Sequence, residues 1–136
     1  MKKYLYLIML PLLFVACSID EKDCEERSIF DECMLEEPTV GKLNVKVTIN
    51  ANNPQVLVSI YKGKYYETGE LVLSEYVTKT EVGYNLPFGD YAGTAIYYVG
   101  SDTLLAVYGD DISKELVEYC NEDCWEITEG DLDLTL

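Results

Sequence analysis

The fold is decided by residues 86–108, which read LPFGDYAGTAIYYVGSDTLLAVY. Pro87 to Asp90 predicts a tight turn, because proline fixes φ and glycine accepts positive φ. Two runs of strand-forming residues follow, Tyr91–Val99 and Thr103–Tyr108, separated by Gly100, Ser101 and Asp102. This spacing predicts an antiparallel hairpin. Both runs are apolar almost throughout, which predicts a position at the centre of a sheet with burial on both faces.

Strand patterns continue on both sides of this hairpin. Alternating apolar and polar residues, or runs rich in Val, Ile and Tyr, predict strands at Leu43–Ile49, Gln55–Tyr61, Glu70–Thr80, Glu81–Leu86, Trp125–Thr128 and Leu132–Leu136. About seven short strands with turn signals between them predict an all-β fold. The expected architecture is an antiparallel β-sandwich of the immunoglobulin-like or prealbumin-like kind.

The segment that follows the hairpin has a different pattern. Gly109, Asp110 and Asp111 predict a turn that ends the second strand. Ile112, Leu116 and Tyr119 then lie at helical spacing. This spacing predicts a short helix over residues 112–119, with a strand as the alternative.

The first 17 residues have the order of a secretory signal. Lys2 and Lys3 precede an uncharged apolar run of 13 residues, Tyr4–Ala16, which leads into Cys17. As a helix this run would span only about 20 Å, against roughly 30 Å for the hydrocarbon core of a bilayer. It is therefore too short for a permanent transmembrane helix.

A small residue followed by cysteine resembles the lipobox of bacterial lipoprotein signal peptides, although Phe14 stands where that family usually has leucine. The resemblance implies that Cys17 becomes the lipidated first residue, with acyl chains such as palmitate, and that the membrane is a partner. The acidic run over residues 20–26 resembles the lipoprotein export signal of Bacteroidetes, which implies the outer face of the outer membrane. The alternatives are an ordinary signal peptide and an acidic tether without sorting meaning.

These features divide the chain into three parts. Residues 1–16 are the expected signal peptide, residues 17–40 the lipidated acidic tether, and residues 41–136 the β-sandwich domain. Pro38 and Gly41 mark the boundary between tether and domain.

A second resemblance concerns residues 41–136. The stretch from Leu86 to Tyr91 and the closing Glu129–Leu134 resemble carboxypeptidase regulatory-like and collagen-adhesin B-type repeats, which implies a prealbumin-like sandwich and little about function. Some adhesin repeats of that type form a lysine-to-aspartate bond, for which Lys46 and Asp133 would be the residues. Lys46 alternates with Val45 and Val47, so we expect it on the solvent face, where such a bond does not form.

The charge of the chain is strongly acidic and unevenly distributed. Ten basic and 25 acidic residues give a net charge of −15, and removal of the two signal lysines makes it −17. This balance excludes nucleic acid as a partner, because phosphate binding needs basic patches. Oxygen-rich acids could hold calcium, and the weak candidates are Asp110, Asp111, Asp131 and Asp133. A solvated surface is the alternative, and no metal or other cofactor is expected.

Four cysteines remain after Cys17: Cys24, Cys33, Cys120 and Cys124. An even number in an exported chain predicts two disulfides, with three possible connectivities. A tetrathiolate zinc site is the competing interpretation, but Cys24 and Cys33 are too far apart for its usual pairs.

Catalytic residue sets are missing from the sequence. The chain contains no histidine, which removes Ser/His/Asp and Cys/His catalysis, and it has no phosphate-binding glycine loop. We therefore expect no enzyme activity. The tyrosines are the best binding candidates, above all Tyr61, Tyr65, Tyr66 and Tyr76, because a flat ring with a hydroxyl suits both sugars and protein surfaces.

The sequence therefore predicts a non-enzymatic envelope lipoprotein that acts as a binding or accessory module, with an unknown protein or glycan as partner. The alternative is an acidic inhibitor or immunity-type protein that neutralises a basic partner.

Overall fold

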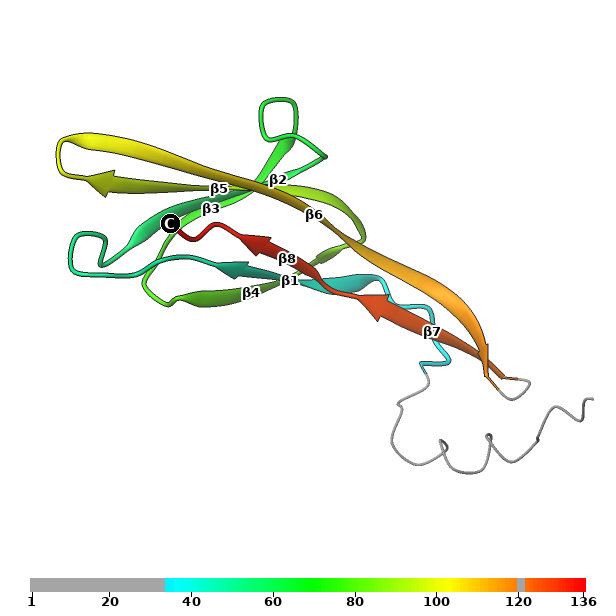
Figure 1. Cartoon of the computed structure of the whole chain (residues 1–136). Helices are drawn as coiled ribbons and strands as arrows, with labels where there is room; N and C mark the ends of the chain where they lie inside the picture. The colour runs from blue at the N-terminus through cyan, green and yellow to red at the C-terminus, as the bar shows by residue number, and fades with distance from the viewer. Residues whose placement is uncertain (1–33, 120–121) are drawn as a thin grey trace, which may run out of the picture. The chain divides into compact units, whose positions relative to one another are not determined.

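The computed structural model describes residues 34–119 and 122–136, and Figure 1 shows them as two stacked sheets. The strands are β1 (Val40–Lys46), β2 (Val56–Lys62), β3 (Glu70–Val77), β4 (Glu81–Pro87), β5 (Gly89–Val99), β6 (Asp102–Tyr119), β7 (Glu122–Thr128) and β8 (Gly130–Asp133). The predicted signal peptide, Cys17, Cys24, Cys33 and Cys120 lie outside the described residues. Within the described ranges, no helix is long and apolar enough to cross a membrane.

The two sheets differ in size. One contains three strands in the order β4-β1-β8, and the other contains five in the order β3-β2-β5-β6-β7. All pairings are antiparallel except that of β1 with β8. The chain changes sheets four times, between β1 and β2, between β3 and β4, between β4 and β5, and between β7 and β8. The predicted antiparallel β-sandwich is confirmed, with eight strands rather than about seven.

The core lies between the two sheets and follows directly from the alternation in the sequence. Leu43, Val45 and Val47 point inward from the first strand and its extension, and each is at most 2% exposed. Successive side chains of a strand point to opposite faces, so their polar neighbours face solvent. The residues that complete the core from the other strands are Val56, Val58, Ile60, Val77, Leu86, Tyr91, Ala95, Tyr97, Ile112, Leu132 and Leu134.

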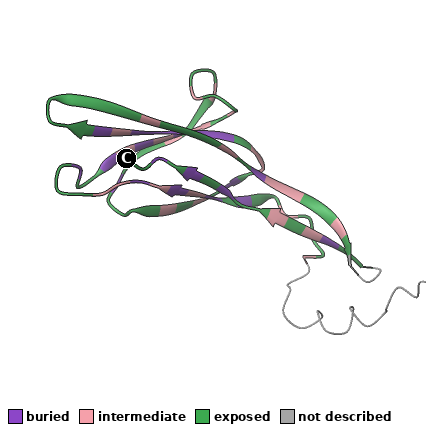
Figure 2. Cartoon of the chain, in the orientation of Figure 1, coloured by how far each residue is buried: buried purple, intermediate pink, exposed green. Residues whose placement is uncertain are grey.

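The predicted central hairpin is present, and it is longer than expected. β5 and β6 pair over eleven residue pairs, from Gly89 with Ile112 to Val99 with Asp102. Gly100 closes the turn with φ of 65°, a conformation that glycine adopts without strain. Burial on both faces is confirmed for β5 and wrong for β6, whose outward residues Leu105 and Val107 are about half exposed, as Figure 2 shows along this strand.

The predicted helix over residues 112–119 is wrong, and so is the predicted turn at Gly109–Asp111. β6 continues through both segments to Tyr119, first against β5 and then against β7. Leu116 is 50% exposed, whereas a helix would have placed it on the buried face with Ile112. The physical reason is that residues 122–128 offer seven backbone partners to residues 113–119, which outweighs a weak local helical pattern.

Lys114 fastens the segment that precedes β1 to the base of the β6–β7 hairpin. Its Nζ donates hydrogen bonds to Glu37 Oε1 at 2.7 Å and to the Pro38 carbonyl at 2.8 Å. The same ammonium lies 4.7 Å from the centroid of the Phe88 ring and 5.2 Å from that of Trp125. The backbone N–H of Trp125 also donates a hydrogen bond to the Met34 carbonyl at 2.9 Å. Residues 34–38, which the sequence assigned to the tether, therefore contact the domain.

Tyr97 connects three strands through its hydroxyl. This side chain is fully buried on β5, accepts a hydrogen bond from the Thr48 N–H at 2.9 Å, and donates one to the Leu134 carbonyl at 2.7 Å. Thr48 follows β1 and Leu134 follows β8. The hydroxyl therefore supplies backbone partners where the β1–β8 ladder ends.

The Tyr97→Phe substitution should lower the free energy of unfolding by about 1–3 kcal/mol, because it leaves the part-buried Thr48 N–H and the buried Leu134 carbonyl without their partner. Urea denaturation followed by circular dichroism measures this change. Tyr76→Phe is the control, since Tyr76 is 59% exposed and its loss of a hydroxyl should have no effect. Equal stability of the two variants would contradict the role given to the Tyr97 hydroxyl.

Alkaline pH should destabilise the domain. Burial raises the pKa of both Tyr91 and Tyr97 above the ordinary value of tyrosine. Because the unfolded chain titrates near pH 10, the stability from these neutral hydroxyls is complete below about pH 10 and is lost as the pH rises above it. Urea midpoints measured between about pH 8 and 11 should therefore fall at the alkaline end, and less steeply in Tyr97→Phe.

Candidate functional site

The five-stranded sheet has an outward surface that no other strand of the described chain covers. Strand register places the residues of this surface, because directly paired residues point to the same side. We call it the outer face, and it consists of Leu57, Ser59, Tyr61, Leu71, Ser74, Tyr76, Ala92, Thr94, Ile96, Tyr98, Thr103, Leu105, Val107 and Gly109.

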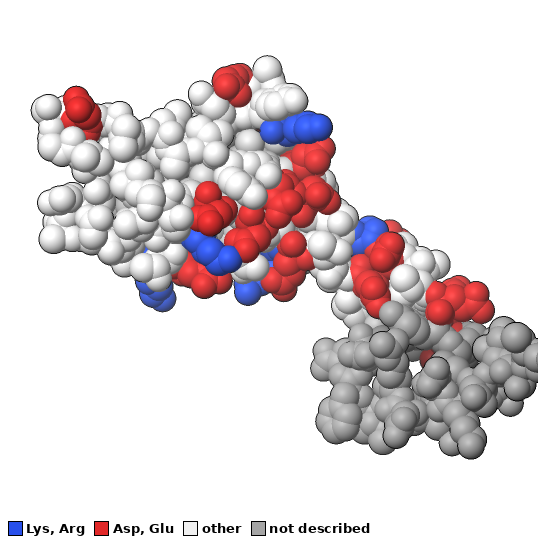
Figure 3. All heavy atoms as spheres, viewed as in Figure 1, with Lys and Arg blue, Asp and Glu red and all other residues white. Residues whose placement is uncertain are grey.

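None of these residues carries a charge, although a quarter of the whole chain is charged, and the first acids on the same side are Asp90 and Asp111, the next same-side pair beyond Ala92 and Gly109. Several large members are well exposed, among them Leu71, Tyr98 and Leu105. In Figure 3 the acidic atoms gather away from the β5–β6 hairpin end, toward the half of the domain that contains β7. Soluble monomers rarely expose a continuous apolar surface of this kind unless it binds something.

The β2–β3 loop folds onto one end of the outer face. Figure 1 shows this loop rising from the five-stranded sheet on the side away from β1 and β4. Gly63 starts it with φ of 128° and donates its N–H to the Asp90 carbonyl at 2.8 Å. Ala92 and Gly109 are paired neighbours beneath the loop, and their small size leaves room for its backbone.

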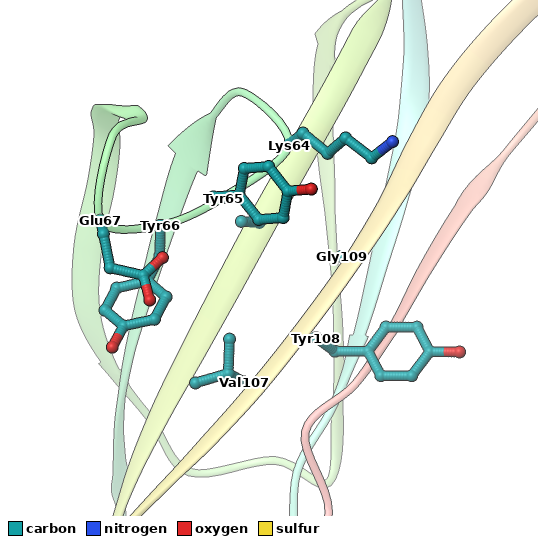
Figure 4. A pocket seen from close by; sticks show the side chains of 8 residues that line it. Lys64, Tyr65, Tyr66, Glu67, Val107, Tyr108 and Gly109 are labelled. Atoms are coloured by element: carbon teal, nitrogen blue, oxygen red, sulfur yellow. The ribbon is translucent and has the colours of Figure 1, made fainter.

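A pocket of about 280 Å³ lies between this loop and β6. Its lining residues are Lys64, Tyr65, Tyr66, Glu67, Ala92, Val107, Tyr108 and Gly109. Figure 4 shows Tyr65, Tyr66 and Glu67 extending from the loop, with Val107 on β6 below them and the Tyr108 ring turned away. The Tyr66 ring also packs against Tyr61, with centroids 6.2 Å apart. The loop therefore provides two aromatic rings and a carboxylate above an apolar floor.

The tyrosines fall into two groups according to their hydroxyls. Tyr84, Tyr91 and Tyr97 donate to Glu75, the Pro87 carbonyl and the Leu134 carbonyl, respectively. For Tyr65 and Tyr66 at the loop, and likewise for Tyr61, Tyr76, Tyr98 and Tyr108, no hydroxyl partner is found among the described residues. The first group is structural, whereas the second has hydrogen-bonding groups available for a ligand.

The four tyrosines predicted as a binding group do not form one cluster. Tyr61, Tyr65 and Tyr66 come together at the loop. Tyr76 lies on the same outer face but on the edge strand β3, paired with Leu57, and does not line the pocket. Of the four predicted residues, Tyr61 and Tyr76 therefore belong to the outer face, whereas Tyr65 and Tyr66 line the pocket.

Of the four acids that were considered for calcium, three have carboxylates engaged in other contacts, and the fourth, Asp111, is placed only by its backbone pairing. Asp110 Oδ2 accepts the Asp131 N–H at 2.7 Å, and Asp131 Oδ2 lies 2.6 Å from Lys46 Nζ. Asp133 accepts hydrogen bonds from both the N–H and the hydroxyl of Thr135, which lower the pKa of its carboxyl group. Asp111 pairs with Asp90 in the β5–β6 ladder. Across residues 34–119 and 122–136, no group of three or more acids, cysteines or histidines could hold a metal ion.

Lys46 is exposed and paired with Asp131, as expected for a solvent-facing residue. The hydrogen bond that the Lys46 ammonium donates to the Asp131 carboxylate raises the pKa of Lys46. Although the backbones of Lys46 and Asp133 pair across the β1–β8 ladder, the amine reaches Asp131 instead. A covalent lysine-to-aspartate bond needs a buried amine, so the geometry does not support one.

Of the disulfide candidates, only Cys124 is among the described residues. It is buried on β7 at 3% exposure. The pairing of the four cysteines stays a prediction.

Sequence reasoning missed most of the pocket. Ala92 and Val107 looked like ordinary strand residues, Gly109 was predicted as part of a turn, and Lys64 and Glu67 looked like loop residues. A usable signal was present in the small residues, because Ala92 and Gly93 follow Tyr91, and Gly109 follows the apolar run that ends at Tyr108. Small residues within strands often mark a close approach of another backbone.

Comparison with known proteins found no match among family models, curated proteins or solved structures. The resemblances to lipoprotein signals and to prealbumin-like repeats therefore stay predictions, and the site must be interpreted from its own geometry.

The Gly69→Ala substitution should displace the loop that forms the pocket. A Cβ at Gly69 would lie 2.9 Å from both Tyr61 Cβ and the Tyr65 carbonyl, atoms that cannot easily move aside. We expect a loss of about 1–3 kcal/mol in stability and changed ring shifts of Tyr65 and Tyr66 in NMR spectra. Gly83→Ala is the control, because its Cβ would meet only the flexible end of Lys42. Unchanged ring shifts in Gly69→Ala would contradict this account of the loop.

Proposed function

We propose that this chain is a non-enzymatic lipoprotein of the cell envelope that uses the outer face of its five-stranded sheet as a binding surface. The observation that carries the proposal is the outer face itself, an uncharged and exposed apolar surface on a strongly acidic protein. Its core strands are well paired, and it ends in a pocket whose tyrosine hydroxyls have no partner among the described residues. Binding sites commonly combine an apolar surface with a few directed polar groups of this kind.

The anchoring part of the proposal comes from the sequence. Ala16 and Cys17 end an apolar run too short to span a bilayer, and an acidic segment follows. We propose lipidation of Cys17 and exposure of the domain at the outer surface of the outer membrane. One lipid chain gives only marginal membrane binding, so a multiply acylated cysteine is the form that would hold the protein stably.

The absence of histidine from the sequence and the engagement of the acids around Asp131 support a role without catalysis. The second candidate, an inhibitor that neutralises a basic partner, rests on the acidic half seen in Figure 3. The two functions differ in salt dependence. Binding through the uncharged outer face should change little with ionic strength, whereas binding through acids should weaken steeply.

Cys17→Ala should release the protein from membranes, because it removes the only attachment site proposed for lipid. The measurement is fractionation of cells into membrane and soluble parts, with detection of the chain by antibody. Cys17→Ser serves as a second variant without the proposed lipid site and should behave identically. Retention of both variants in the membrane fraction would rule out the anchor.

Leu105→Glu should abolish capture of envelope components by the immobilised protein, since it places a charge in the middle of the outer face. Leu116→Glu is the matched control, because Leu116 lies on the same strand with nearly the same exposure, 50% against 49%, but outside the outer face. We expect at least about tenfold weaker capture for the first variant only. Similar melting temperatures should show that both variants fold, and equal capture by both would overturn the proposed surface.

A further inference from the structure

We propose that the pocket between the β2–β3 loop and β6 binds a single neutral sugar ring of a glycan. This inference rests on the proposed binding function of the outer face and names the class of ligand. It is carried by the juxtaposition of Tyr65, Tyr66 and Glu67 over Val107.

The size of the pocket limits the ligand to about one ring. Its volume of about 280 Å³ is near the lower limit for small-molecule sites. The pocket is closed on one side by the loop and continues on the other onto the outer face, where Val107 and Leu105 follow each other along β6. One ring of a longer glycan fits this shape, with the rest of the glycan lying along the sheet.

The chemistry of the walls suits a ring that has both an apolar face and hydroxyl groups. The Tyr65 and Tyr66 rings offer flat apolar surfaces, and their hydroxyls have no partner among the described residues. The Glu67 carboxylate is an acceptor that can take hydrogen bonds from two neighbouring hydroxyls of a sugar. Lys64, at the rim, provides the complementary donor.

The charge of the protein disfavours sugars that carry a negative charge. Lys64 and Glu67 balance each other, so the pocket has no net formal charge. The whole chain carries −15, and its field opposes the approach of anions such as uronic acids. A cationic ligand would meet Lys64 inside the pocket, and the nearest acids of the same sheet face, Asp90 and Asp111, form the next same-side pair beyond the lining residues Ala92 and Gly109. A neutral hexose or N-acetylhexosamine is the class that remains.

The test uses the full-length protein in detergent and saturation-transfer NMR. The probes are methyl glycosides of glucose, galactose, mannose, N-acetylglucosamine and N-acetylgalactosamine, with glucuronic acid as the anionic comparison. At least one neutral glycoside should bind with a dissociation constant of the order of 1 mM, and glucuronic acid should not bind. Raising the salt concentration from about 0.05 to 0.5 M should leave the affinity nearly unchanged.

Substitutions then locate the binding. Tyr65→Ala and Tyr66→Ala should each raise the dissociation constant by about tenfold or more, whereas Tyr65→Phe and Glu67→Gln should raise it by about two- to tenfold. Tyr76→Ala is the matched control, an exposed tyrosine of the same outer face that does not line the pocket, and it should leave the affinity within about twofold.

Three results would overturn the inference: no neutral glycoside binds, Tyr76→Ala weakens binding as much as Tyr65→Ala, or glucuronic acid binds more tightly than the neutral sugars. Its failure is distinguishable from failure of the proposed function. If no sugar binds but Leu105→Glu still abolishes capture, the ligand class is wrong and the binding surface stands. If Leu105→Glu and Leu116→Glu capture equally well, the surface itself is wrong.

Discussion

The ladder between β5 and β6 is the interaction on which the rest of the structure depends. Its two strands are adjacent in sequence and are closed by a short turn at Gly100, so little loop entropy is lost in forming it. Every other strand of the larger sheet attaches to this hairpin, β2 and β3 through β5, and β7 through the far half of β6. The inward residues Tyr91, Ala95 and Tyr97 then provide the surface against which the smaller sheet packs.

The unequal size of the two sheets has a direct physical consequence. Three strands can cover only one face of a five-stranded sheet, and no further layer of the described chain covers the other. The outer face nevertheless contains large apolar residues, which lose the favourable free energy of burial at about 25 cal/mol per Å² while they stay exposed. A surface whose only task was solubility would place lysine and glutamate there, as the three-stranded sheet does at Lys46 and Asp131.

Most strands could be predicted from the sequence. The strand over residues 110–119 and the exposure of one face of β6 could not. Period-two patterns and the turn at Gly100 correctly predicted the sandwich, because alternation and glycine placement are local properties. The strand from Asp110 to Tyr119 was missed, since Lys114 occupies an inward position and hides the alternation, and since the stabilising partner β7 is supplied by tertiary structure. The exposed face of β6 was missed for a related reason. An apolar run does not reveal whether a second layer exists to cover it.

The pocket illustrates the same limit at the level of single side chains. All twelve tyrosines look alike in the sequence, and what separates structural from available ones is the partner of the hydroxyl. For Tyr91 and Tyr97 that partner is a backbone carbonyl, 4 and 37 residues away, whose position depends on the completed fold. Tyr65 and Tyr66 lie on a loop held over Ala92 and Gly109, and no partner for their hydroxyls is found among the described residues. Tyrosine hydroxyls without a hydrogen-bond partner among the described residues are the ones that a ligand can use.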